Sequence, residues 1–355
     1  MNPILITATD ESTGKTAVAL ALALVARERG RSVGYMKPKG TRLQSAVGKT
    51  LDEDPLVARE VLGLDAGMAD LEPVVYSRTF VEQVMRGRED PAALRDRIRD
   101  RYDALSADHD LMVVEGGGSF ATGGVAGLTD ADVADLLDAR AVLVARYEDP
   151  TDADAVLSAA RHLGDRLAGV LFNAVPDAAL DGLRADAIPF LEGEGIPVFG
   201  AIPRVRELAG VTVADLASEL GGRVLTTDAP TDAFVERFTV GAMSADDALT
   251  QFRRTRDAAV ITGGDRPEIH SAALDAPGIK CLVLTGGFEP PGAVLGRAEE
   301  AGVPVVLVQS DTITTVERCE DVVRSGRARD ARTVERMREL LTDGADVDRM
   351  LALSG

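Results

Sequence analysis

The sequence predicts an α/β protein in which two domains each carry a mostly parallel sheet with helices on both faces. Short apolar runs alternate with amphipathic stretches along most of the chain, which is typical of parallel sheets covered on both sides. The chain has 355 residues, more than a single hydrophobic core usually serves. The alternation loosens once, near residues 204–222, where three glycines interrupt it. We therefore expect a first domain over residues 1–205, a smaller second domain over residues 206–325, and a helical tail over residues 326–355.

The first domain is expected to be the larger of the two sheets with its covering helices. Its predicted strands are Pro3–Ala8, Ser32–Lys37, Leu111–Glu115, Ala141–Ala145, Ala168–Asn173 and Val198–Ile202. Its predicted helices are Lys15–Arg29, Pro91–Leu105, Val133–Asp138, Asp152–Leu163 and Ala178–Glu192.

The second domain shows the same alternation on a smaller scale. Its predicted strands are Arg223–Thr226, Phe234–Gly241, Ala259–Thr262, Lys280–Thr285 and Pro304–Val308. Its predicted helices are Asp246–Arg253, Glu268–Leu274, Gly292–Ala301 and Thr312–Val323. The tail has the amphipathic pattern of one or two helices that pack on a domain or on a partner.

Composition and charge exclude several classes of function. No stretch approaches the roughly 20 apolar residues that a membrane span needs, and the N-terminus lacks the features of a signal peptide, so we expect a cytoplasmic protein. The net charge of −19 argues against nucleic acid and against an anionic membrane as partners. The two cysteines and three histidines are scattered without metal-ligand spacing, so a metal centre built from them is not expected.

Lysine is scarce in this chain. Only five lysines stand against 34 arginines, and the acidic residues are spread along the whole sequence. A dispersed acidic surface with few lysines is typical of a salt-rich cytoplasm and favours a halophilic archaeon as the source. Four of the five lysines lie in the first fifty residues, which points to a specific use for them there.

A phosphate-binding loop is predicted between the first strand and the first helix. The segment Ala8-Thr9-Asp10-Glu11-Ser12-Thr13-Gly14-Lys15-Thr16 ends in Gly-Lys-Thr, so Thr9 to Thr16 are candidate nucleotide contacts. Backbone amides and the helix N-terminus would surround phosphate oxygens, Lys15 would reach the β- and γ-phosphates, and the Thr16 hydroxyl would face magnesium. The strict pattern requires a first glycine where Thr9 stands, which leaves a chance Gly-Lys-Thr as the alternative.

A second Gly-Lys-Thr, Gly48-Lys49-Thr50, follows no predicted strand. We therefore expect it to be an ordinary loop.

Other polar residues are predicted at the ends of later strands, where ligands bind in open α/β sheets. Lys37 ends the second strand, Thr41 follows it, and Asp54 opens a short helix. Glu115 ends an apolar strand and is followed by three glycines that allow close approach of a ligand. Asn173 closes a later strand and is placed to bind a base edge. The alternatives are a surface lysine for Lys37, a solvated strand-end acid for Glu115 and a turn residue for Asn173.

Five of these motifs, in order, resemble dethiobiotin synthetase. They are Ala-Thr-Asp with Gly-Lys-Thr, Gly-Tyr-Met-Lys-Pro, Asp54, Val-Val-Glu-Gly-Gly-Gly and Phe-Asn, and together they cover residues 1–205. The resemblance implies a P-loop ATP-binding domain in which Lys15 and Lys37 stabilise charge on the γ-phosphate. It implies that Thr16, Asp54 and Glu115 hold Mg²⁺, that Asp10 and Thr41 lie near metal or phosphate, and that Asn173 contacts adenine. The synthetases transfer a phosphoryl group from ATP to a carbamate and form dimers, so a homodimer is expected.

One departure concerns the substrate. After Tyr76 the family has a proline-rich segment that shapes the diaminopelargonate pocket, but this chain reads Ser-Arg-Thr-Phe-Val-Glu-Gln-Val-Met-Arg. Dethiobiotin synthesis itself is therefore not expected.

The second domain resembles a DRTGG domain. The motifs are Val-Gly-Ala-Met-Ser, Ile-Thr-Gly-Gly-Asp-Arg, Leu-Thr-Gly-Gly and Val-Gln-Ser-Asp-Thr, each at or after a predicted strand. A synthetase-like domain followed by a DRTGG domain is similar to the N-terminal region of long phosphotransacetylases. Because the chain stops at Gly355, we expect a stand-alone relative without acetyltransferase activity.

Two glycine turns mark a candidate site in this domain. They could bind an anion, a nucleotide or another small ligand with Arg266 as a clamp, or they could be tight turns with Arg266 paired to Asp265. The candidate residues are Gly263, Gly264, Asp265, Arg266, Thr285, Gly286 and Gly287.

Two functions remain open at this stage. The favoured one is a nucleotide-responsive regulatory protein that binds ATP and Mg²⁺ and is linked to acyl or acetyl-CoA metabolism. The alternative is an ATP-dependent ligase or amidoligase that activates a carboxylate or carbamate, with Lys15, Lys37 and Thr41 as catalytic candidates. A decayed site fits poorly, because both phosphate lysines remain in a lysine-poor chain.

Overall fold

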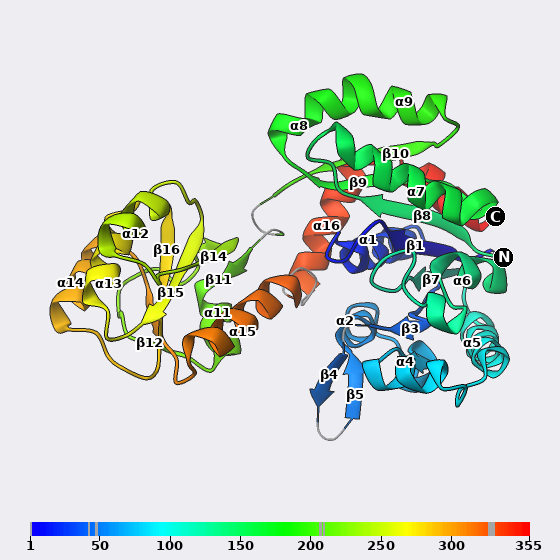
Figure 1. Ribbon diagram of the computed structural model, residues 1–355. Coiled ribbons are helices and arrows are strands. Elements are labelled where there is room, and N and C mark those ends of the chain that lie inside the picture. Colours follow the sequence, from blue (N-terminus) through cyan, green and yellow to red (C-terminus); the bar gives the residue numbers. More distant parts are fainter. Residues whose placement is uncertain (1, 42, 47–48, 206–207, 209, 326–330) are drawn as a thin grey trace. The chain divides into compact units, whose positions relative to one another are not determined.

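The computed structural model describes residues 2–41, 43–46, 49–205, 208, 210–325 and 331–355. The chain divides into two compact units (Figure 1). Unit 1 comprises Met1–Val205 together with Ala328–Gly355, and unit 2 comprises Arg206–Arg327. Within the described residues, none of the helices is long and apolar enough to cross a membrane.

Unit 1 is built on a six-stranded sheet whose strands are all parallel, in the order β10-β9-β8-β1-β7-β2. This confirms the predicted fold class. The strands β1, β7 and most of β8 are completely buried, as near-continuous apolar sequence requires when both faces are covered. The strands of this sheet are β1 (Ile4–Ala8), β2 (Val33–Met36), β7 (Leu111–Glu115), β8 (Arg140–Ala145), β9 (Leu167–Val175) and β10 (Val198–Pro203).

Helices cover both faces of this sheet. On one face α5 (Pro91–Ser106), α6 (Asp130–Leu137) and α7 (Ala153–Leu163) share a core with the strands. On the other, α1 (Lys15–Glu28) packs against α16 (Ala331–Gly344) from the end of the chain, which lies beside it in Figure 1. Because α16 covers its outer side, α1 is buried almost all round, which explains its run of alanine, leucine and valine.

The remaining elements of unit 1 are short. The helices are α2 (Glu53–Leu62), α3 (Met68–Leu71), α4 (Arg78–Met85), α8 (Asp177–Gly182), α9 (Ile188–Gly193) and α17 (Val347–Leu351). Short 3₁₀ and π turns are η1 (Gly124–Ala126), η2 (Pro150–Asp152), η3 (Gly164–Arg166), η4 (Leu183–Ala187) and η6 (Ala352–Ser354). Two small ribbons complete the unit, β3 (Lys39–Gly40) with β6 (Val74–Val75) and β4 (Leu43–Ala46) with β5 (Lys49–Asp52).

Unit 2 has a five-stranded sheet in the order β12-β17-β16-β15-β14, in which only β12 runs antiparallel to its neighbour. Its strands are β12 (Arg223–Val224), β14 (Arg237–Val240), β15 (Ala258–Gly263), β16 (Ile279–Thr285) and β17 (Val305–Leu307), with β11 (Val211–Thr212) and β13 (Phe234–Val235) forming a separate pair. Its helices are α11 (Val213–Leu220), α12 (Ala245–Phe252), α13 (Pro267–Leu274), α14 (Gly292–Ala301) and α15 (Thr312–Ser325).

One local prediction was wrong, and one helix was not predicted. Lys49 and Thr50 lie in strand β5 and not in a loop, while Gly48 lies outside the described residues. A search for apolar runs misses this hairpin, because backbone pairing with β4 holds it and its sequence is polar. Residues 213–220, placed in the loosened segment, form helix α11, which Thr212 caps by accepting a hydrogen bond from the Asp215 amide.

Candidate functional site

The loop between β1 and α1 lies at the carboxyl edge of the sheet and has the features of an anion-binding loop. The first turn of α1 contains no acidic side chain, and no side chain caps the helix, so its amide hydrogens and positive dipole end are available. Ser12 and Gly14 adopt positive φ angles of 56° and 87°. A β-carbon at Gly14 would collide with the amide nitrogen of Asn173, which donates a 2.7 Å hydrogen bond to the Thr13 carbonyl. Asn173 therefore positions the loop.

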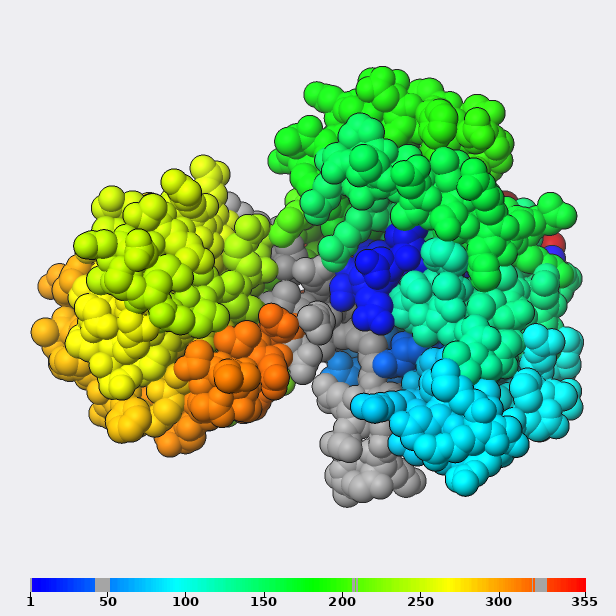
Figure 2. Space-filling view, in the orientation of Figure 1, coloured from blue at the N-terminus to red at the C-terminus, as the bar shows by residue number. Residues whose placement is uncertain are grey.

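This part of the chain reaches the surface. In Figure 2 the dark blue atoms near the N-terminus lie in a recess bordered by teal and green atoms of unit 1. A ligand thus has access to the loop.

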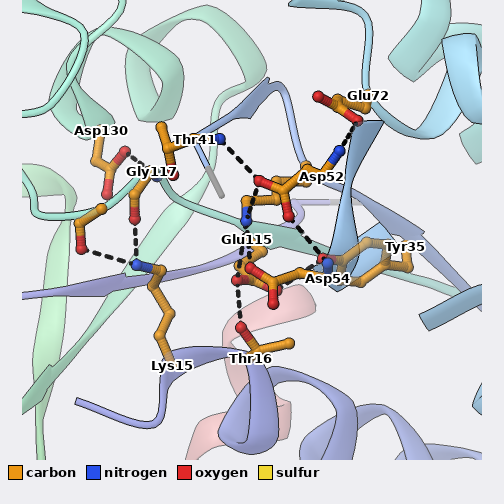
Figure 3. Close-up of polar contacts among 12 residues, drawn as sticks. Lys15, Thr16, Tyr35, Thr41, Asp52, Asp54, Glu72, Glu115, Gly117 and Asp130 are labelled. Atoms are coloured by element: carbon orange, nitrogen blue, oxygen red, sulfur yellow. Dashed lines mark hydrogen bonds and ion pairs between the residues drawn. The ribbon is translucent and has the colours of Figure 1, made fainter. Parts of the chain in front are cut away.

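Lys15 points from the start of α1 to the glycines that follow β7 (Figure 3). Its ammonium group donates hydrogen bonds to the carbonyl oxygens of Gly117 and Gly118, the latter at 3.0 Å. Burial lowers the pKa of Lys15, although Glu115 and Asp130 act in the opposite direction. Carbonyl groups cannot neutralise its charge, so the cation remains available to an anionic ligand.

Thr16 and Glu115 form the next part of the site. The Thr16 hydroxyl donates to Glu115 Oε1 at 2.7 Å, and the Tyr35 hydroxyl donates to Glu115 Oε2 at 2.7 Å. Burial, followed by the charge of Asp54, raises the pKa of Glu115 to about 7. The pKa of Tyr35 is raised by the same burial and by Glu115, so Tyr35 stays a donor.

Lys37 lies among three carboxylates. Its ammonium nitrogen contacts Asp54, is 2.8 Å from Asp52 Oδ2, and is 3.7 Å from Glu115 Oε1. Burial by itself lowers the pKa of Lys37, but these neighbours outweigh burial and raise that pKa above its ordinary value. Lys37 is therefore a fully charged lysine, although it is only 1% exposed.

Asp52 ties together the segment that follows Lys37. Its side chain accepts hydrogen bonds from the amide of Thr41 at 2.7 Å and from that of Asp54 at 2.9 Å. The Asp52 amide in turn donates to Glu72 Oε2 at 3.1 Å, whereas Glu72 Oε1 has no hydrogen-bond partner in the described structure. Burial raises the pKa of Glu72 to about 7.

A second buried ion pair supports the glycine turn. Lys39 Nζ lies 2.5 Å from Asp130 Oδ1, which also accepts from the Gly117 amide at 3.1 Å. The Thr7 hydroxyl donates to the other oxygen of Asp130. This pair holds the strand β1, the segment after β2 and the turn after β7 together at one edge.

The structure thus brings Lys15, Thr16, Lys37, Asp54 and Glu115 into one connected cluster, with Thr41 and Asn173 at its margins. The other predicted loop residues, Thr9 to Thr13, connect β1 to α1. Thr9 donates its amide to the Val144 carbonyl at 3.1 Å, and Asp10 accepts from the Glu11 amide at 2.7 Å.

Sequence reasoning missed several members of the cluster, namely Tyr35, Lys39, Asp52, Glu72 and Asp130. Two of them gave a signal: Lys39 is one of the rare lysines near the N-terminus, and Tyr35 stands in the Gly-Tyr-Met-Lys-Pro motif. The others are single polar residues whose burial depends on long-range packing.

Burial singles out this cluster from the rest of the protein. All the lysine, aspartate and glutamate side chains that are buried among the described residues belong to it: Lys15, Lys37, Lys39, Asp52, Asp54, Glu72, Glu115 and Asp130. Buried ionisable groups are costly and concentrate at functional sites.

The cluster also has the donors that a hard divalent cation prefers. Five carboxyl groups face three ammonium groups, and two of the carboxyls have pKa values raised to about 7. Bound positive charge would relieve that excess. Within the described residues, no three histidine, cysteine or carboxylate side chains could hold a metal by themselves. Thr16, Asp54 and Glu115 fit Mg²⁺ as a partial set of oxygen ligands that phosphate oxygens and water would complete.

In unit 2, the predicted glycine turns lie together at the carboxyl edge of the sheet. The Gly264 amide donates to the Thr285 carbonyl at 3.2 Å, and the Thr285 hydroxyl lies 2.8 Å from that of Thr312. Gly286 and Gly287 have φ angles of 81° and 73°, so the second turn needs glycine for its backbone conformation. In the first turn, a β-carbon at Gly264 would collide with the Phe288 carbonyl. Gly263 ends β15 and Asp265 lies in the turn after it.

Arg266 braces this edge of unit 2. Its guanidinium donates to the carbonyls of Gly241 at 2.6 Å and Met243 at 2.8 Å, and it lies 3.3 Å from Glu268. Its ion pair is with Glu268, and no ion pair with Asp265 occurs in the described part of the chain.

Comparison with known proteins gives two family matches. Residues 2–212 match the model of an AAA domain (AAA_26), and residues 215–322 match that of the DRTGG domain. The ATP-dependent dethiobiotin synthetase BioD of Aromatoleum aromaticum is 32% identical over 222 residues, which cover 60% of this chain and 93% of the synthetase.

Other relatives extend over both units. The phosphate acetyltransferase of Haemophilus influenzae is 27% identical over 337 residues, which cover 85% of this chain and 46% of that enzyme. The chain thus spans about half the length of this acetyltransferase. A solved structure of the CBS and DRTGG domains of Clostridium perfringens pyrophosphatase, complexed with its activator diadenosine tetraphosphate, aligns with a TM-score of 0.26 and 16% identity, over 38% of this chain and 68% of that chain.

Proposed function

Because the chain belongs to the AAA domain (AAA_26) family and also carries a DRTGG domain, we propose that it is an ATP- and magnesium-binding regulatory protein. In this proposal unit 1 binds the nucleotide. Whether the nucleotide is bound would then control an activity linked to acyl or acetyl-CoA metabolism. The observation that carries it is the buried cluster of Lys15, Thr16, Lys37, Asp54 and Glu115 at the end of the phosphate loop.

The triphosphate would lie along the loop from Thr9 to Thr16. In the described part of the chain the Lys15 ammonium donates its hydrogen bonds to carbonyl oxygens, so exchanging those carbonyls for phosphate oxygens would improve its electrostatic environment. Asn173, whose amide donates to the Thr13 carbonyl, would also contact adenine.

Thr16, Asp54 and Glu115 would hold Mg²⁺. The ion supplies charge neutralisation for the β- and γ-phosphates. Thr16 and Glu115 already share a hydrogen bond of 2.7 Å, so their oxygens are close enough to serve one ion. Glu115 must be ionised to bind a metal, but burial raises the pKa of Glu115. Bound Mg²⁺ would therefore lower the pKa of Glu115.

Regulation is favoured over ligation by the surroundings of Lys37. Phosphoryl transfer needs a cation whose charge is free to stabilise the transferring group. If Asp54 and Glu115 turn to the metal, Asp52 still neutralises Lys37 at 2.8 Å. We therefore expect slow hydrolysis, which suits a protein that reports ATP and does not consume it quickly.

An ATP-dependent ligase or amidoligase is the second candidate. The similarity to dethiobiotin synthetase over 93% of that enzyme favours it, as does the retention of Lys37 and Thr41. The acceptor in that case would be a carboxylate or carbamate.

Unit 2 would act as the responding part. We propose that its glycine turns, from Gly263 to Arg266 and from Thr285 to Gly287, bind a small ligand, and that the chain works as a homodimer in a salt-rich cytoplasm. Support comes from the convergence of both turns at one sheet edge and from the net charge of −19.

Steady-state ADP release by the purified protein in molar KCl tests the proposal. We expect ATP binding with negligible turnover, and binding abolished in Lys15→Ala. Rapid turnover that depends on one particular acid would favour the ligase instead. Unchanged ATP affinity in Lys15→Ala would remove the phosphate loop from consideration.

A further inference from the structure

Arg146 is a cation at the phosphate loop that the predicted nucleotide contacts do not include. It directly follows β8, the strand that pairs with β1 in parallel, so it lies at the same sheet edge as the loop. One of its terminal nitrogens donates a hydrogen bond to the Ser12 carbonyl. Its Nε atom is buried and has no hydrogen-bond partner among the described residues.

The Ser12 carbonyl is the point where the loop needs support. Ser12 has a φ angle of 56°, in the left-handed region that non-glycine residues rarely adopt. The next carbonyl, that of Thr13, is held at 2.7 Å by Asn173 from β9. Two successive loop carbonyls are therefore bonded to side chains that come from neighbouring strands, which fixes the loop just before the N-terminus of α1.

The charge of Arg146 is not cancelled locally. No ion pair between Arg146 and a carboxylate occurs within the described ranges, and the group that accepts its hydrogen bond is the neutral Ser12 carbonyl. A half-buried cation beside a loop that receives polyphosphate adds favourable potential, and this effect grows with the number of phosphates.

We propose that Arg146 is a positioning residue of the nucleotide site: through the Ser12 carbonyl it holds the loop in the form that accepts phosphate. This inference rests on the proposed function, because it presumes that the loop binds a nucleotide. It adds the residue that follows β8 to a site otherwise built from α1, α2 and the ends of β1, β2, β7 and β9.

Calorimetric titration of the full-length protein with ATP, ADP and AMP in the presence of Mg²⁺ tests it. Arg146→Ala should weaken ATP binding about 10- to 100-fold, since a hydrogen bond to a charged group contributes roughly 1.5–3 kcal/mol. AMP binding should change little, so the ATP-to-AMP affinity ratio should fall. Added guanidinium ion should restore part of the ATP affinity, which a general loss of stability would not allow.

Arg140 provides a matched control. It starts the same strand, is partly exposed, and donates to the Asp165 carbonyl at 2.7 Å, far along β8 from the loop. Arg140→Ala should bind ATP as the wild type does. If Arg146→Ala does not fold, Arg146→Lys replaces it, and a smaller loss of ATP affinity is expected, because the charge stays while the guanidinium geometry is lost.

The outcomes separate this inference from the proposed function. ATP affinity equal to that of the wild type in the folded Arg146 variant, while Lys15→Ala binds none, overturns the role of Arg146 alone. Absence of ATP binding by the wild type rejects the proposed function, and the inference with it.

Discussion

Three buried lysines lie within one cluster, and their partners give each a different role. Lys15 contacts carbonyl oxygens, Lys37 contacts carboxylates, and Lys39 forms a close pair with Asp130. The pKa of Lys15 is lowered by burial, whereas the pKa of Lys37 is raised by its carboxylate neighbours in spite of burial. Lys15 would therefore attract an incoming anion most strongly. Lys37 would attract the anion only when its carboxylate neighbours bind another cation.

Asp52→Asn tests whether Asp52 restrains Lys37. Asparagine is as good a helix cap as aspartate and can keep the bond from the Asp54 amide through its one oxygen. It loses the acceptor for the Thr41 amide and the charge beside Lys37. We expect ADP release to rise by up to roughly tenfold, which corresponds to about 1.4 kcal/mol of barrier. Asp90→Asn, at the N-cap of α5, should leave the rate unchanged. A rate for Asp52→Asn at or below that of the wild type would count against the restraint.

Glu72 makes stability depend on pH. Its pKa is raised from 4.5 to about 7, mainly by burial, so the folded state binds a proton more tightly than the unfolded state does. The free energy of unfolding should therefore decrease as pH rises from about 4.5 to about 7. Glu72→Gln, which stays neutral, should remove on the order of 1–3 kcal/mol of that decrease.

Urea unfolding at pH 5, 6, 7 and 8 measures this effect of Glu72. The exposed Glu194→Gln serves as the control and should follow the wild type. Equal pH dependence in Glu72→Gln and the wild type would show that Glu72 titrates normally.

Among the helices and strands, those with a pattern of apolar residues were mostly predicted from the sequence. Elements with a mostly polar sequence were mostly missed. The six strands of the unit 1 sheet were predicted within a few residues, because most of them are buried apolar runs of the kind that parallel sheets require; the edge strand β10 is only partly buried. The hairpin β4–β5 and helices α4 and α11 were missed, since they are short and α4 has no buried residue.

The residues of the candidate site also fall into those that the sequence predicted and those that it did not. The loop before α1 follows a known spacing, so Lys15 and Thr16 could be predicted from the sequence alone. Asp130 and Glu72 could not, because nothing near them in sequence signals that a distant strand will bury them. Arg146 resembles any arginine after a strand until the fold brings it to Ser12.

Gly14→Ala tests the junction between loop and helix. Gly14 has a φ angle of 87°, and an added β-carbon would meet the Asn173 amide that holds Thr13. We expect ATP affinity to fall at least tenfold, because strain on the order of 1–3 kcal/mol would distort the loop. The control is Gly182→Ala, where nothing lies within 4 Å of the new carbon and helix α8 should tolerate alanine. Full ATP affinity in Gly14→Ala would show that the loop geometry does not matter.

The whole molecule consists of two units with separate hydrophobic cores. One core joins the unit 1 sheet to α5, α6 and α7, and two others lie within unit 2. The C-terminal helix α16 belongs to unit 1, where its buried residues Val334, Met337 and Leu341 cover α1. Nucleotide binding should therefore stabilise one unit selectively.

Differential scanning calorimetry checks that selectivity. Mg²⁺ with ATP should raise the midpoint of the unit 1 transition by several degrees, since a ligand at 100 times its Kd adds about 2.7 kcal/mol of stability. The transition of unit 2 should shift less than that of unit 1, because unit 2 would respond to ATP without binding it at the loop before α1. A shift confined to unit 2 would place the nucleotide in the wrong unit.

The central claim is that the loop before α1 binds a triphosphate–magnesium complex, and a crystal structure with ATP and Mg²⁺ tests it most directly. We expect phosphate density along Thr9–Thr16, the Lys15 ammonium moved from the Gly117 and Gly118 carbonyls onto phosphate oxygens, and Mg²⁺ between Thr16, Asp54 and Glu115. Density for ATP elsewhere, with Lys15 still bonded to those carbonyls, would contradict the account.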